Sequence, residues 1–394
     1  MGKVKPNTIK IVKKANSALV LDSIKTYGSI TVDSILRNTG LSRPTILKVL
    51  KDLLEKRIII KAGFGESEIG RSPILYSLNT NEIFAIGVDV DGPPIHIGIA
   101  DISGRLLHAI TIELEEDSSI LTIKNAISQG ISECIDLLKI KKEDVLGVGL
   151  GLPASIDIKN NCALNVSRFS ALAKQPIADM LFNDNGIPVT VRNDAHLIGV
   201  AEKRKLSKDI SDMLCIIHRT GIGMATILNN QLYSGDTGNS GFIGHMVIDC
   251  QGKECACGRK GCLEALASKR AIRELYHNFT GEKKKYSEII ESAQKNDEVA
   301  IETCRIAGNY LGIGIANVVK TLDIYTIVIS DIGCNEDHIF FKSIYKSLKE
   351  YVTPYFNKPF KLYSGKLRSH ELPLGGCIFI IDNFFVSPEL KLRI

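Results

Sequence analysis

Residues 244–265, which read GHMVIDCQGKECACGRKGCLEA, concentrate side chains that bind metal ions. Four of the ten cysteines of the chain fall between residues 250 and 262, and a histidine precedes them. Thiolates in the pattern CxC followed by four residues and a further Cys, with two glycines in between, can wrap around one ion. An imidazole nitrogen can then complete a tetrahedral set. The pattern favours a closed, structural metal site.

A redox device and a disulfide knot are the alternatives. In a long intracellular chain, a local cysteine cluster indicates metal binding or catalysis more often than disulfides. A redox pair is the weaker alternative, because CxC lacks the usual CxxC spacing. We therefore predict one structural zinc ion per chain, held by His245, Cys255, Cys257 and Cys262. On the residues alone, Cys250 stays a fifth candidate ligand.

The length and composition limit the kinds of fold that can position this site. A chain of 394 residues with 44% hydrophobic content can fill two or three cores, so several domains are expected. No apolar run reaches the roughly 18–20 residues of a membrane span. The start, MGKVKPNTIKIVKKAN, has no apolar stretch of the signal-peptide type. We expect a cytoplasmic protein with no membrane partner.

Positive charge is concentrated at the amino-terminal end. Residues 1–79 carry 14 Lys and Arg against 6 Asp and Glu, a net charge of +8 within a chain whose total is +5. Such a segment suits a polyanion, and double-stranded DNA is the obvious partner.

The same segment has the pattern of a winged helix-turn-helix. Residues 16–30 and 31–40 predict two short helices that end at glycines, and Ser42 with Pro44 predicts the start of a third. This third helix has apolar residues at helical spacing, which leaves Arg43, Thr45, Lys48 and Lys51 facing bases and phosphates. Residues 57–79 predict two strands around a polar tip, with Arg71 placed for a minor groove. The alternative is a small helical domain with a solvated basic face.

From Glu82 onward, strands and helices alternate in the order of mixed α/β lobes. Predicted strands lie within 83–114, 144–157, 187–193 and 213–235, the last of these a hairpin. The stretch 144–157 is predicted to be one strand that runs into a loop. A long helix followed by a strand is predicted for residues 300–333.

At this point the chain resembles the ROK family of repressors, open reading frames of unknown function and sugar kinases. The resemblance rests on the signature GH…CxCGxxGCxE, here His245 to Glu264, and it leaves Cys250 out of the ligand set. It implies a two-lobed actin-like body behind the winged helix, with a sugar pocket between the lobes. The implied domains are 1–79 for DNA binding, 80–190 with 376–394 as the first lobe, and 191–375 as the second lobe with the zinc loop.

The resemblance also implies a sugar site. The NDAN motif of the family matches Asn193 and Asp194, and its sugar-binding His and Glu fall on His245 and Glu264. Amide and carboxylate groups suit sugars because each can hold two hydroxyls. The GExGH glutamate of the family is replaced here by Phe242, which removes an acceptor and adds an aromatic face. For Asn193 and Asp194, an ordinary strand-to-helix cap is the alternative.

The phosphate-binding loops of the kinases are degraded in this sequence. The DxGGTK turn reads DVDGPP, residues 89–94, where two prolines remove amide donors and stiffen the turn. The second loop survives in part as RTGIGMAT, residues 219–226, and the late GG reads Ser330 and Asp331. We expect no ATP binding and no catalytic residue.

The predicted function is therefore a DNA-binding transcriptional repressor of sugar-utilisation genes. Its body would sense a carbohydrate or sugar phosphate, and its DNA-binding form would be a homodimer or homotetramer. The alternatives are a ROK sugar kinase acting on a hexose or N-acetylhexosamine, and a repressor controlled by a protein partner.

Overall fold

The computed structural model describes residues 6–66, 72–207, 209–352 and 358–386. The chain folds into two compact units. Unit 1 combines Met1–Leu152, Asn161–Arg192 and Pro373–Ile394, and unit 2 combines Pro153–Asn160 and Asn193–Leu372. Both contain helices and strands, so the predicted α/β class is confirmed. The finer division into three domains stays a prediction.

The amino-terminal part of unit 1 has the three predicted helices and the two predicted strands, together with a short strand, β1, that was not predicted. They are α1 (Pro6–Tyr27), β1 (Ile30–Thr31), α2 (Val32–Thr39), α3 (Arg43–Glu55), β2 (Ile59–Phe64) and β3 (Ile74–Leu78). The strands form a sheet in the order β1-β3-β2, with both pairs antiparallel. Helix α1 begins ten residues before the predicted start at Asn16, because Pro6 is tolerated at a helix start and the following Lys, Ile and Ala residues continue a helix.

Helices α2 and α3 are separated by the turn that the sequence signals. The αL conformation of Gly40, with φ of 67°, ends α2. The Ser42 hydroxyl then accepts the N–H of Thr45 and begins α3. Four apolar side chains of α3 are buried, namely Ile46, Val49, Leu50 and Leu53. Because this apolar stripe packs inward, the opposite face of α3 points to solvent.

The rest of unit 1 is built on a five-stranded sheet in the order β10-β7-β4-β5-β6. Its strands are β4 (Phe84–Asp89), β5 (Ile95–Asp101), β6 (Leu106–Ile112), β7 (Val145–Leu152) and β10 (Val189–Asn193). The pair β4 and β7 is parallel, whereas β5 pairs antiparallel with β4 and β6. Other elements of unit 1 are α4 (Ile120–Leu137), η1 (Lys142–Asp144), β9 (Cys162–Val166), η2 (Ser170–Leu172), α5 (Ile177–Asn185) and α12 (Leu374–Val386).

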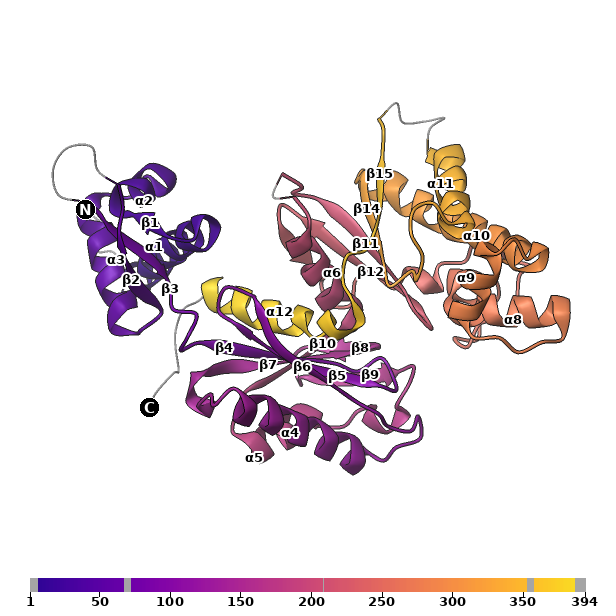
Figure 1. Ribbon diagram of the computed structural model, residues 1–394, viewed down its shortest axis with the longest axis horizontal. Helices are drawn as coiled ribbons and strands as arrows, with labels where there is room; N and C mark the ends of the chain where they lie inside the picture. The colour runs from indigo at the N-terminus through magenta and orange to yellow at the C-terminus, as the bar shows by residue number, and fades with distance from the viewer. Residues whose placement is uncertain (1–5, 67–71, 208, 353–357, 387–394) are drawn as a thin grey trace. The chain divides into compact units, whose positions relative to one another are not determined.

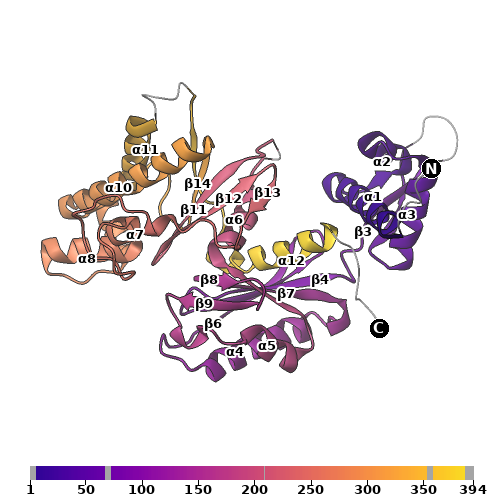
Figure 2. The same ribbon diagram turned by 180° about the vertical axis from the view of Figure 1, so that it is seen from behind.

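Helix α12 covers one face of this sheet, and α4 and α5 cover the other (Figures 1 and 2). Glycines allow α12 to approach the strands closely. A Cβ placed on Gly149 of β7 would lie 2.4 Å from the carbonyl oxygen of Gly376 in α12. A Cβ on Gly87 of β4 would lie 1.7 Å from the carbonyl oxygen of Pro373. The carboxyl-terminal helix therefore packs backbone to backbone on the sheet.

Unit 2 has its own five-stranded sheet, in the order β13-β12-β11-β14-β15. Its strands are β11 (Met213–His218), β12 (Ile222–Leu228), β13 (Gln231–Tyr233), β14 (Thr326–Ser330) and β15 (Lys361–Ser364). Its helices are α6 (Asp194–Lys205), η3 (Ile243–His245), α7 (Leu263–Ala267), α8 (Lys269–Thr280), α9 (Tyr286–Gln294), α10 (Glu298–Leu322), α11 (Ile339–Val352) and η4 (Ser369–Glu371). The predicted hairpin and the long helix with its following strand are confirmed. The loop predicted after Leu152 contains a further strand, β8 (Ala154–Asp157).

Alternate residues of β11 serve two cores. Cys215 and Ile217 pack with Ile198 of α6 on one face of the sheet. Leu214 and Ile216 face a larger core that the long helix α10 shares with α11. The sheet thus places α6 on one side and the helical layer on the other. Within the described ranges of the chain, no helix combines the length and the apolar character that crossing a membrane requires.

Candidate functional site

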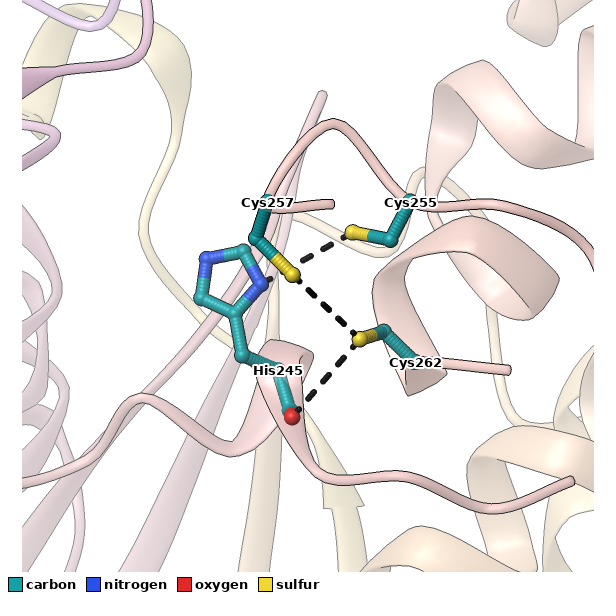
Figure 3. A group of neighbouring side chains, drawn as sticks. All are labelled: His245, Cys255, Cys257 and Cys262. Atoms are coloured by element: carbon teal, nitrogen blue, oxygen red, sulfur yellow. Dashed lines mark hydrogen bonds between the residues drawn. The ribbon is translucent and has the colours of Figure 1, made fainter. Parts of the chain in front are cut away.

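Three thiols and one imidazole converge in unit 2 (Figure 3). The ligand atoms of His245, Cys255, Cys257 and Cys262 all lie within 4.8 Å of one another. His245 ends η3, Cys255 and Cys257 come from the following loop, and Cys262 is the N-cap residue of α7. Cys255 and Cys262 are buried, His245 is half-buried and Cys257 is exposed. The structure therefore brings together all four predicted ligands, while Cys250 is exposed and stands outside the group.

The backbone holds the cysteine loop in this shape. Gly258 and Gly261 both have positive φ, at 83° and 68°. A Cβ on Gly261 would lie only 1.4 Å from the carbonyl oxygen of Asp249, so no other residue fits there without movement. The Cys255 N–H donates to the Arg259 carbonyl at 2.7 Å. The glycines of the sequence pattern thus shape the loop around the thiols.

The spacing of the ligand atoms fits a tetrahedral metal. Tetrahedral angles with metal–sulfur bonds of about 2.3 Å and a metal–nitrogen bond of about 2.0 Å separate ligand atoms by about 3.5–3.8 Å. The Cys257 and Cys262 sulfurs are 3.6 Å apart, and the Cys255 sulfur is 3.8 Å from His245 Nδ1. A disulfide would need about 2.05 Å between sulfurs. The residues present can hold one metal ion.

The three thiols differ in acidity. Burial raises the pKa of Cys255, and it raises that of Cys262 to about 12. The N–H of Arg259 lowers the pKa of the exposed Cys257. Because thiolates are the ligands, metal binding must displace protons from the two buried thiols, and it couples ion uptake to folding.

Asn193 and Asp194 lie at the junction of β10 and α6. The Asn193 side chain caps α6, since its Oδ1 accepts the N–H of His196 at 3.4 Å. Its Nδ2 donates to the Ala154 carbonyl at 3.0 Å. The cap predicted as an alternative is thus present, and the amide keeps one donor hydrogen and one lone pair beyond these two hydrogen bonds. Asp194 is buried, with 6% of its surface exposed.

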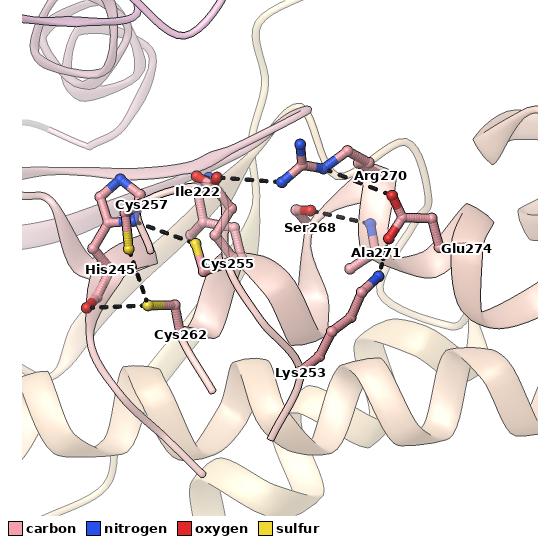
Figure 4. Close-up of polar contacts among 11 residues, drawn as sticks. Ile222, His245, Lys253, Cys255, Cys257, Cys262, Ser268, Arg270, Ala271 and Glu274 are labelled. Atoms are coloured by element: carbon pink, nitrogen blue, oxygen red, sulfur yellow. Dashed lines mark hydrogen bonds and ion pairs between the residues drawn. The ribbon is translucent and has the colours of Figure 1, made fainter. Parts of the chain in front are cut away.

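Glu264 lies beside the turn between β11 and β12. Its Oε2 accepts the N–H of Ile222 at 3.4 Å, and Arg270 lies 3.8 Å from its Oε1. Figure 4 shows Arg270 extended from α8 beside Ile222, with its other side toward Glu274. Gly244, the residue before His245, packs against Ile222 and Glu264. Glu264 therefore lies next to Gly244, which directly precedes the candidate metal ligand His245.

Phe242, which stands where the family motif has an acceptor glutamate, lies beside His245. Phe242 is exposed, and its ring stacks on that of His245 with centroids 6.5 Å apart and an interplanar angle of 13°. It presents an apolar face beside the candidate sugar-binding histidine.

An ion-pair network surrounds Asp194, and the sequence reasoning missed two of its members. Arg219 Nη1 is 3.4 Å from Asp194 Oδ2, and Arg219 Nε is 3.3 Å from Asp331 Oδ2. Lys269 Nζ is 3.1 Å from the same Asp331 oxygen. We call Asp194, Arg219, Lys269 and Asp331 the Arg219 network. A basic residue directly before the TGIG turn was the signal in the sequence that could have found Arg219.

The candidate DNA-binding residues lie on one exposed face of α3. Arg43, Lys48 and Lys51 are exposed, whereas Thr45 is half-buried and its hydroxyl is 2.8 Å from that of Ser42. Arg43 Nη1 is 2.6 Å from Asp33 Oδ1, but both side chains are more than half exposed. Exchange of such a pair for a phosphate costs little, about 0–1 kcal/mol. The predicted minor-groove residue Arg71 lies outside the described residues.

The turn that would bind nucleotide phosphates in a kinase is occupied by a side chain in unit 1. A Cβ on Gly92 would lie 2.4 Å from Cζ of Arg168, so the guanidinium lies against the DVDGPP turn. Arg168 Nε in turn contacts Glu116 at 2.6 Å.

Known proteins resemble this chain over most of its length. A profile of the ROK family matches residues 85–382. The xylose repressor of Bacillus spizizenii is 28% identical over 376 residues, which cover 95% of this chain and 96% of that protein.

Two solved structures resemble it in fold. The crystal structure of a ROK family transcriptional regulator, described as a homologue of the E. coli MLC protein, superposes with a TM-score of 0.83 at 22% identity. The match covers 95% of this chain and 97% of that one. The ROK hexokinase of Thermus thermophilus gives a TM-score of 0.63 at 24% identity, covering 75% of this chain and 98% of the hexokinase. The predicted sugar-kinase-like body of the actin-like class is thereby confirmed.

Proposed function

The chain belongs to the ROK family, and we propose that it is a DNA-binding transcriptional repressor that responds to a carbohydrate. The observation that carries the proposal is the exposed basic face of α3, a capped helix in the helix-turn-helix that precedes the ROK body in the same chain. The likeness to a xylose repressor over nearly the whole chain supports it.

Helix α3 has the chemistry of a recognition helix. Its buried stripe leaves Arg43, Lys48 and Lys51 on the outer face, where they would meet phosphates and base edges in a major groove. One winged helix covers too little DNA for strong specificity, so we propose that a homodimer or homotetramer reads a pseudo-palindromic operator.

The test is salt-dependent binding of the full chain to DNA from its own promoter region. Lys48→Ala should weaken binding and reduce the slope of log K against log salt by about one unit, because one phosphate contact is lost. Lys142→Ala removes another exposed lysine charge, from η1, and is the matched control. If both variants bind as the wild type does, or if both lose affinity equally, α3 is not the DNA-reading element.

We propose that the sugar binds at Asn193, Asp194, His245 and Glu264, which all belong to unit 2 and offer amide, carboxylate and imidazole groups. Contacts of the turn between β11 and β12 with Asp194, Glu264 and Gly244 support this proposal. Sugar hydroxyls are both donors and acceptors, and a set with both kinds of partner suits them. Melting-temperature shifts on adding D-xylose or D-glucose test this proposal, since a ligand stabilises the state that it binds.

We propose that His245, Cys255, Cys257 and Cys262 bind one structural zinc ion. The ligand types and the spacing of their atoms support zinc. When bound, the ion would join the cysteine loop to His245, and with it to the candidate sugar site. It would supply folding energy to unit 2 without taking part in a reaction.

We propose further that the chain is not a kinase. Two prolines and the Arg168 guanidinium occupy the DVDGPP turn, and Asp194 is engaged by Arg219. Phosphoryl transfer depends on holding donor and acceptor in line, which a carboxylate without a positioned donor cannot achieve. ATP-dependent phosphorylation of a hexose or N-acetylhexosamine that Asp194→Asn abolishes would overturn this proposal.

A further inference from the structure

The Arg219 network is a fixed, internally neutral set of charges. Arg219 is buried, with a side chain that is 6% exposed, and it lies between the carboxylates of Asp194 and Asp331. Lys269 contacts the same Asp331 oxygen as Arg219 does. The positive charges of Arg219 and Lys269 cancel the negative charges of Asp194 and Asp331. Burying Arg219 without partners would be strongly unfavourable, so these carboxylates are needed where they are.

Asp331 holds its place at a cost in backbone energy. Its φ of 57° lies in the left-handed region, which residues other than glycine adopt only uncommonly. Asp331 directly follows β14, and its carboxylate contacts both Arg219 and Lys269. The ion pairs of the Asp331 side chain therefore offset the cost of its left-handed backbone conformation.

The cations of the network are held from other sides as well. Lys269 Nζ lies over the ring of Tyr286, 5.3 Å from its centroid, in the geometry of a cation–π contact. His218, next to Arg219, donates from Nε2 to the Ala267 carbonyl at 2.8 Å. Burial and the Lys269 charge lower the pKa of His218 to about 4, so the imidazole is neutral near pH 7. It adds no positive charge to the network.

The network adjoins both candidate sugar carboxylates. The turn between β11 and β12 begins with Arg219, whose side chain contacts Asp194, and it ends at Ile222, whose N–H contacts Glu264. Arg270 in turn lies beside Glu264 and Glu274. The guanidinium groups of Arg219 and Arg270 thus already face carboxylates of the chain.

We propose that Asp331 is a built-in counter-ion that occupies the position of a ligand phosphate, so that the effector bound at Asn193 and Asp194 is an unphosphorylated sugar. This inference rests on the proposed function, because it concerns the same site. A phosphate monoester would bring a charge of about −1.5 to −2 beside two carboxylates. It would also have to displace a carboxylate that is tethered 3.1–3.3 Å from both cations and competes as an intramolecular group.

The test uses the full-length protein and isothermal titration calorimetry. Two matched pairs of probes, D-xylose with D-xylose 5-phosphate and D-glucose with D-glucose 6-phosphate, are titrated into the wild type. Inorganic phosphate is titrated into the wild type, Asp331→Asn, and Asp331→Asn combined with Lys269→Gln. Asparagine tolerates the left-handed backbone of position 331, so the variant keeps the local shape while it removes the carboxylate from Lys269 and leaves Arg219 paired only with Asp194 within the network.

We expect the wild type to bind a neutral sugar at least tenfold more tightly than its phosphate ester. Asp331→Asn should bind inorganic phosphate at least tenfold more tightly than the wild type, and the added Lys269→Gln should reverse most of that gain. Tighter binding of either sugar phosphate by the wild type would overturn the inference, as would an Asp331→Asn variant with unchanged phosphate affinity. If Asp331→Asn gains affinity for inorganic phosphate but no probe sugar binds the wild type, the counter-ion role stands. The proposed sugar sensing then fails for these sugars.

Discussion

Replacement of Cys257 by serine tests the metal site with the least disturbance of packing. Cys257 is exposed, whereas Cys255 and Cys262 are buried, so their replacement would mix metal loss with core damage. Serine has nearly the size of cysteine but is a much poorer zinc ligand. The matched control is Cys250→Ser, an exposed cysteine of the same segment that lies outside the ligand group.

The size of the effect follows from the loss of one ligand out of four. Loss of one of four ligands should weaken zinc binding at least as much as loss of an outer-shell partner, about 100-fold or about 2.7 kcal/mol. With free zinc at about 1,000 times the wild-type Kd, bound metal stabilises the wild type by about 4 kcal/mol. The variant, then at about ten times its own Kd, keeps about 1.4 kcal/mol. For a unit of this size, the difference corresponds to a melting temperature about 5–10 °C lower.

Metal content and thermal unfolding measure these quantities together. The wild type and Cys250→Ser should each hold about one zinc per chain. Cys257→Ser should lose zinc on dialysis, unfold at a lower temperature and repress weakly, while chelation of the wild type should reproduce the lower melting temperature. A wild type without metal, or equal behaviour of the two serine variants, would refute the reasoning.

Three further predictions concern stability. The unfolded His218 takes up a proton below its ordinary pKa of 6.5, and the folded one only near pH 4. Stability should therefore fall by about 3 kcal/mol as the pH drops from 6.5 to 4, and His218→Gln, unlike the exposed control His370→Gln, should flatten the pH profile of the melting temperature. Gly149→Ala should cost about 1–3 kcal/mol in urea unfolding, because its Cβ would overlap the Gly376 backbone; unchanged stability would contradict the close packing of α12. Ser42→Ala should destabilise α3 by about 1 kcal/mol and Ser42→Gly by only a few tenths, whereas equal losses would argue against the cap.

Local signals in the sequence placed the helix-turn-helix correctly, and they picked out the His and Cys side chains that the structure groups as candidate metal ligands. Ser42 and Gly40 mark helix ends through bonds that span only three or four residues, and the tertiary fold leaves them intact. The cysteine cluster is similar, because its glycines shape a short loop whatever surrounds it. The start of α1 was placed too late, since no cap or periodicity break marks residue 16 as a helix end.

The environment of Asp194 was decided by the tertiary structure. The motif at residues 193 and 194 was visible in the sequence, but Arg219 is 25 residues from its partner Asp194, and Asp331 follows another strand, β14. These residues meet because β11 pairs with β14 in parallel, which brings Ser330, next to Asp331, opposite Ile217 near the end of β11. Pairing between distant strands depends on the burial of both faces of the sheet, and no local spacing encodes it. The sequence alone therefore determined which groups could bind a metal, DNA or a sugar, whereas the sheet decided which charges neutralise one another.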